Sequence, residues 1–92
     1  VTTADELELY LAERRRNPLI TGGLLSIEGM HAIEGDLANI EMLQRAGFRM
    51  MGLAHFFDND LGGSAHGMAK GGLTDLGRAA VRRMEELGIV VD

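Results

Sequence analysis

Three ionisable side chains follow apolar runs of this sequence. Glu28 follows the run 19–27, His55 comes shortly after the run 48–53, and Asp92 follows three β-branched residues. A carboxylate at the rim of an apolar element has to be compensated by a cation or by several hydrogen-bond donors. Glu28 is therefore interpreted either as a metal-binding or catalytic carboxylate or as one partner of a structural salt bridge.

Four other polar side chains lie near these positions. His31, three residues after Glu28, is interpreted as a hydrogen-bond donor behind a ligand or as a packed loop histidine, in preference to a direct metal ligand. Asp58 and Asn59 either line a substrate pocket or form a turn before a glycine-rich segment. His66 lies within that segment, which acts either as a lid over a site or as a solvated flexible loop.

Capping patterns indicate three helices that would hold these residues in place. Thr3 has the spacing of a capping box with the acidic residue three positions later, and the arginines at 14–16 suit the negative end of a helix dipole. An apolar stripe over 36–46 indicates a second helix. Thr74 is the predicted N-cap of a third helix over 75–87. Each helix is followed by an apolar run.

Those apolar runs, 19–27, 48–53 and 89–91, are predicted to be strands, the first of them buried. Strands that are separated by helices indicate right-handed βαβ crossovers and a parallel sheet, and hence an α/β fold. Functional side chains of such folds gather at the carboxyl ends of the strands. Three parallel strands leave two open edges, which predicts that residues 1–92 are a single α/β segment of a larger sheet.

Composition excludes several classes of function. The chain has 92 residues, no cysteine and a net charge of −5. The lack of cysteine excludes disulfide frameworks and thiol nucleophiles, and the acidic balance argues against a nucleic-acid partner. No apolar run is long enough to span a bilayer, and without cysteine or a signal peptide a cytoplasmic location is expected. The initial valine suggests an excised or processed piece.

Three sequence blocks carry a specific resemblance. They are the segments 27–33 (IEGMHAI), 47–55 (GFRMMGLAH) and 72–92, and their order together with the separation of Glu28 from His55 makes the match specific. Over residues 22–92 the chain resembles the membrane dipeptidase (renal dipeptidase) family of zinc metallohydrolases. The loop that follows His55 resembles a bacterial branch of that family.

This resemblance implies a (β/α)₈ TIM barrel, of which the chain would supply about three of eight strands, with two zinc ions at the carboxyl face. It implies that Glu28 bridges both metals and that His55 binds the substrate and stabilises the tetrahedral intermediate. A metal-activated water would then cleave the peptide bond of a dipeptide. The family's His-x-Asp pair and its later histidine ligands are absent from this sequence. The isolated chain is therefore expected to hold no stoichiometric zinc and to be inactive.

Three functions remain open at this point. The chain is a segment of a dipeptidase-like zinc hydrolase, or a family member that acts on another small amide substrate. Alternatively, it is a non-catalytic module that assembles through its open sheet edges, either with the remainder of a barrel or with a second copy of itself.

Overall fold

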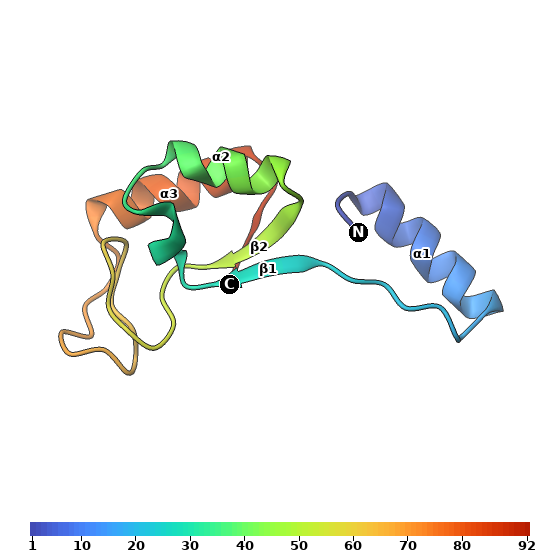
Figure 1. Ribbon diagram of the computed structural model, residues 1–92, viewed down its shortest axis with the longest axis horizontal. Coiled ribbons are helices and arrows are strands. Elements are labelled where there is room, and N and C mark those ends of the chain that lie inside the picture. The colour runs from blue at the N-terminus through green and yellow to red at the C-terminus, as the bar shows by residue number, and fades with distance from the viewer.

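A computed structural model describes the whole chain, residues 1–92, and shows a parallel sheet that is covered on one face by two helices (Figure 1). The three strands lie in the order β1-β2-β3, and both neighbouring pairs are parallel. The predicted α/β class and parallel sheet are confirmed. The elements in chain order are α1 (Ala4–Arg16), β1 (Leu25–Glu28), the 3-10 helix η1 (Met30–Ile33), α2 (Ala38–Arg45), β2 (Phe48–Gly52), α3 (Asp75–Glu86) and β3 (Val90–Val91).

Capping side chains begin α1 and α3 where the sequence predicts them. Thr3 accepts a hydrogen bond from the amide of Glu6 at 3.1 Å, and Thr74 accepts one from the amide of Gly77 at 3.0 Å. The Glu6 carboxylate accepts from the amide of Thr2 at 2.6 Å, so the second bond of the capping box goes to the residue before the N-cap. These bonds satisfy amides that have no partner within the helix.

β1 is shorter and more exposed than the sequence predicts. The strand predicted over 19–27 is confirmed only over 25–27, because residues 19–24 lie outside the sheet, and its predicted burial is wrong, because Leu25 is 54% exposed. β1 is an edge strand that pairs only with β2, and its first paired residue, Leu25, lies opposite Phe48, the first residue of β2. The residues before Leu25 therefore have no neighbouring strand with which their backbone groups could form a ladder.

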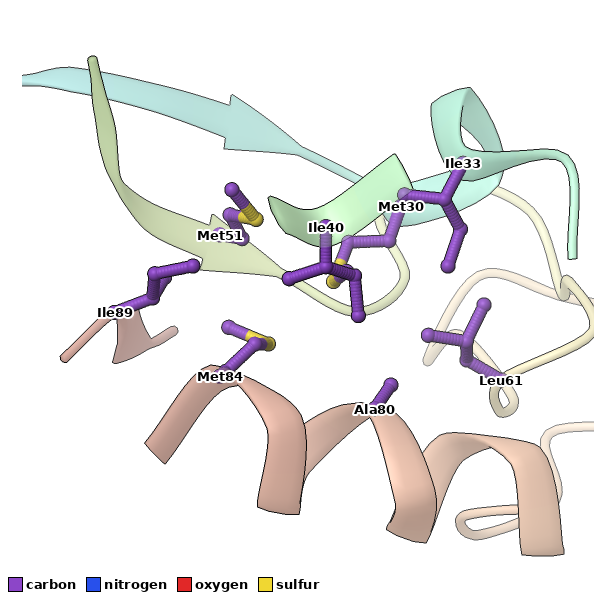
Figure 2. Close-up of a cluster of buried hydrophobic side chains, with 8 residues drawn as sticks. All are labelled: Met30, Ile33, Ile40, Met51, Leu61, Ala80, Met84 and Ile89. Carbon is purple, nitrogen blue, oxygen red and sulfur yellow. The ribbon is translucent and has the colours of Figure 1, made fainter. Parts of the chain in front are cut away.

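The hydrophobic core lies between the sheet and the two covering helices (Figure 2). The covering helices α2 and α3 contribute side chains to one side of the core. β2 and the residue before β3 contribute side chains from the sheet, and η1 closes one end. η1 has no counterpart among the predicted elements, although two of its four residues are fully buried. The eight core residues are Met30, Ile33, Ile40, Met51, Leu61, Ala80, Met84 and Ile89.

The other face of the sheet carries no helix (Figure 1). Successive side chains of a strand point to opposite faces, and Met51 and Ile89 belong to the core. Their neighbours Met50 and Val90 pair across β2 and β3 on the helix-free face, where Val90 is 56% exposed. Glu28 lies on this face as well, because the residue before it packs against the core.

α1 lies apart from the core, at the far side of an extended segment (Figure 1). It has no buried residue. Arg49 of β2 joins the start of the chain to the sheet, because its Nε donates to the carbonyl of Thr2 at 2.7 Å and its Nη1 donates to the carbonyl of Gln44 at 2.6 Å. In the middle of α1, the ring of Tyr10 packs so closely on Gly22 that a Cβ on this glycine would come within 2.8 Å of the ring.

Candidate functional site

The carboxyl ends of β1 and β2 bring Glu28 and His55 together. Glu28 is the last residue of β1 and pairs with Gly52, the last residue of β2; His55 follows shortly after. The Nε2 atom of His55 lies 3.4 Å from Oε2 of Glu28. The two side chains are 42% and 68% exposed, so a ligand from solvent can reach both. The parallel register thus brings together the two residues for which the sequence predicts the chemistry.

Asp92 lies at the same edge of the sheet. Its amide donates to the carbonyl of Met51 at 3.1 Å, which places it directly after β3. Its Oδ2 atom lies 3.6 Å from the point that a Cβ on Gly52 would occupy. Gly52 lies at the end of the middle strand and has no side chain, and the Asp92 carboxylate lies beside it.

His31 packs against the backbone beside Glu28 and forms no hydrogen bond with its carboxylate. Gly29 has φ +87°, and a Cβ on it would lie 2.6 Å from Cε1 of the His31 ring. Gly29 is therefore required twice, for its backbone conformation and for the close approach of the imidazole. Its amide donates to the carbonyl of Gly52 at 3.0 Å, which continues the ladder past Glu28.

Asp58 lies inside the loop that connects β2 to α3. Its Oδ1 accepts a hydrogen bond from the amide of Ser64 and its Oδ2 accepts one from the amide of Ala69, both at 2.8 Å. These backbone amides, Ala69 first, lower the pKa of the Asp58 carboxyl below its ordinary value because they stabilise the charged form. The bonds are those of the loop-forming role; a contact with substrate stays a prediction.

Asn59 forms the turn that follows. Its Oδ1 accepts from the amides of Leu61 at 2.9 Å and Gly62 at 3.3 Å, while its Nδ2 donates to the carbonyl of Leu53 at 2.6 Å. An asparagine that accepts from the amide two residues ahead forms an Asx turn. The side chain therefore ties the end of β2 to the start of the loop, and the substrate-lining role predicted for it is left untested.

His66 approaches His55 through an aromatic neighbour. The ring of Phe56 lies 4.2 Å from that of His55 and 5.6 Å from that of His66, edge to face in both cases. The buried hydroxyl of Ser64 donates to the carbonyl of His55 and accepts from the amide of His66 at 3.1 Å. Sequence reasoning missed Ser64 because a serine among glycines carries no signal of burial. The position of Phe56 next to His55, by contrast, is a signal from which a contact between the two rings could have been predicted.

The donor atoms of this chain do not fit a zinc site on their own. A zinc ion in a protein takes three or four protein ligands. Glu28 and His55 are two donors, and the structure contains no group of three or more histidine, cysteine, aspartate or glutamate side chains placed to hold a metal ion. Any zinc bound at this edge would need ligands besides the residues described.

The single surface pocket lies at the opposite end of the strands. It is lined by residues at the start of α1, by Leu24 before β1, by Arg49, and by Gly88 and Val90 at the start of β3. None of the candidate site residues lines it. The Glu28–His55 pair therefore lies at the exposed carboxyl ends of the strands and not within a cavity of this chain.

Comparison with known proteins identifies the family. The sequence model of the family described as Membrane dipeptidase (Peptidase family M19) matches residues 1–92, which includes α1, outside the resemblance noted above. The dipeptidase aclJ of Aspergillus oryzae is 35% identical over 71 residues, which are 75% of this chain and 17% of that protein. No solved structure matches. None of the helices is long and apolar enough to cross a membrane. The chain belongs to the membrane dipeptidase family, peptidase family M19.

Proposed function

We propose that this chain supplies part of the active site of a dipeptidase-like metallohydrolase that cleaves the peptide bond of dipeptides. The observation that carries the proposal is the 3.4 Å approach of the His55 imidazole to the Glu28 carboxylate at the carboxyl ends of adjacent parallel strands. In α/β folds this edge is where binding and catalytic residues gather. Family membership supports peptide hydrolysis, and one relative is itself named a dipeptidase.

In this proposal residues 1–92 are one segment of a larger (β/α)₈ barrel. The helix-free face of the sheet would be turned toward the barrel interior, which accounts for the apolar side chain of Val90 on that face. Glu28 would contribute one carboxylate to a two-zinc centre whose remaining ligands lie outside these residues. When bound, zinc would supply Lewis-acid chemistry to the hydrolysis.

His55 has the substrate-binding role. Its Nε2 lies 3.4 Å from the Glu28 carboxylate and the side chain is 42% exposed, so the imidazole can donate a hydrogen bond to a substrate oxygen there. A donor aimed at the oxygen of a peptide carbonyl stabilises the negative charge that develops during attack. The substrate contacts predicted for Asp58 and Asn59 form no part of this proposal, because their side-chain atoms already bind the loop. His31 would steady the Glu28 backbone. A cytoplasmic location stays a prediction.

The test uses the complete protein that contains this chain, with zinc added and a panel of dipeptides and other small amides as substrates. Glu28→Gln removes a charge and a metal-binding oxygen without changing size, and we expect it to lose bound zinc and activity together. His55→Gln should retain zinc while kcat falls about 10²–10³-fold, the cost of one oxyanion donor. Glu8→Gln, an exposed glutamate on α1, is the matched control.

Each outcome separates the functions that were left open. If Glu28→Gln keeps wild-type zinc and activity, the site is not where we place it. Turnover of other amides but not of dipeptides would instead favour a family member that acts on another small amide substrate.

The non-catalytic module has one observation in its favour, which is the pair of exposed sheet edges. Leu25 of β1 is 54% exposed, and Val90 and Val91 of β3 are 56% and 42% exposed. Exposed apolar edge strands invite pairing with another chain. Size-exclusion chromatography of residues 1–92 tests this function, and a clean monomer at 10.0 kDa would exclude self-assembly.

A further inference from the structure

The loop over residues 54–73 is organised around one carboxylate. Asp58 accepts hydrogen bonds from the amides of Ser64 and Ala69, one on each of its oxygens. Gly67 lies against the same carboxylate, and a Cβ at that position would be 2.7 Å from Oδ2 and closer still to Oδ1. Both oxygens of Asp58 and the space around them are thus committed to the loop.

A second set of bonds connects this loop to His55. The hydroxyl of Ser64, whose residue is only 4% exposed, donates to the main-chain carbonyl of His55. The amide of that same serine is the one bound by Asp58. Asp58 therefore reaches the backbone of His55 through a single residue, by two consecutive hydrogen bonds.

The other side of the His55 segment is held independently. Asn59 donates to the carbonyl of Leu53, two residues before His55. The imidazole of His55 thus projects from a short stretch of backbone that is bonded on both sides to the loop that follows it. A side chain positioned in this way loses little entropy when it engages a ligand.

We propose that Asp58 and Ser64 are positioning residues: Asp58 holds Ser64, and Ser64 holds the main chain at His55, so that the loop keeps the imidazole beside Glu28. The lowered pKa of Asp58 agrees with this arrangement, because a carboxylate that binds amides favours its charged form. The inference rests on the proposed function for its kinetic consequences and on hydrogen bonds alone for its structural ones.

The test compares Asp58→Asn with Asp60→Asn in the complete protein. Asparagine turns one acceptor oxygen into an NH₂ donor that faces a backbone amide, so one of the two loop bonds is lost. Asp60 lies in the same loop, is exposed, and its side chain has no hydrogen-bond partner, which makes it the matched control. We expect Asp58→Asn alone to accelerate amide hydrogen exchange over 60–70 about tenfold and to lower kcat about tenfold at nearly constant KM.

Ser64→Ala is the second variant, and it guards against a loop that fails to fold without Asp58. It removes the bond to the His55 carbonyl and the bond from the amide of His66, while leaving the amide of residue 64 bound to Asp58. Exchange should then rise at the amide of residue 66, whose acceptor is the deleted hydroxyl, with a similar loss of kcat.

Three results would overturn the inference. They are a rise in KM at constant kcat for Asp58→Asn, which would make Asp58 a substrate contact, wild-type exchange in both variants, and wild-type kcat for Ser64→Ala. The exchange measurements decide the hydrogen bonds even if the protein hydrolyses no dipeptide, so failure of this inference is distinguishable from failure of the proposed function.

Discussion

Gly77→Ala should destabilise the protein, although helix propensity alone predicts the reverse. Replacing a helical glycine with alanine normally stabilises by up to about 1 kcal/mol. Gly77, however, is buried where α3 meets the loop, and a Cβ there would lie 2.9 Å from the carbonyl carbon of Leu61 and closer to its oxygen. That oxygen also accepts the amide of Thr74 at 2.9 Å, and the Leu61 side chain is in the core.

The added Cβ would therefore clash with the backbone of Leu61, which is held by the hydrogen bond from Thr74 and by its own buried side chain. No side-chain rotation can relieve this clash. Overpacking of this kind costs about 1–3 kcal/mol, and the fixed backbone places the cost near the upper end. After the propensity gain is subtracted, we expect the free energy of unfolding to fall by about 1–2 kcal/mol.

Urea unfolding followed by far-UV circular dichroism measures this change. Gly72→Ala, in the same loop and with nothing within 4 Å of its Cβ position, is the control and should leave the midpoint unchanged or slightly raised. If Gly77→Ala stabilises by the full propensity value, then α3 and the Leu61 backbone are not in close contact and the reasoning is refuted.

Two further predictions concern the core and the loop. Met84→Ala should lower the free energy of unfolding by about 2–5 kcal/mol, because Met84 is fully buried between α3 and the sheet; a loss below 1 kcal/mol in the same urea assay would contradict the packing in Figure 2. The pKa of Asp58 is lowered from its ordinary value of 3.8, so its contribution to stability is fully present above that pH and is lost as pH falls through the folded-state value. The urea midpoints of wild type and Asp58→Asn should therefore differ at pH 6 and converge once the pH falls below the folded-state pKa of Asp58, and a constant difference would argue against the amide bonds.

Several features of this chain follow from short-range patterns. Thr3 and Thr74 cap helices because each needs only the amide three residues later, and that spacing is visible in the sequence. The alternation of apolar runs with helices is enough to predict parallel strands, since crossovers of that length join parallel neighbours. The same order places Glu28 and His55 after neighbouring strands, and the quoted blocks around them led to the correct family.

Other features depend on partners that are distant in the chain. β1 begins at Leu25 and not at residue 19 because β2 offers a paired residue only from Phe48 onward. Whether an apolar residue is covered depends on what lies across the sheet, which is why Leu25 reads as buried in the sequence and is exposed in the structure. η1 escaped prediction because its four residues have no periodicity that could be recognised.

The sequence by itself determined the alternation of helices and strands, the caps that begin α1 and α3, the family and the two residues that meet at the carboxyl ends of the strands. The tertiary structure decided how far β1 extends, that Asp58 and Asn59 bind the loop, and that Ser64 supports His55. The difference has a physical cause. Caps are set by interactions between residues a few positions apart, whereas a carboxylate or a hydroxyl can satisfy any donor or acceptor that the folded chain brings to it.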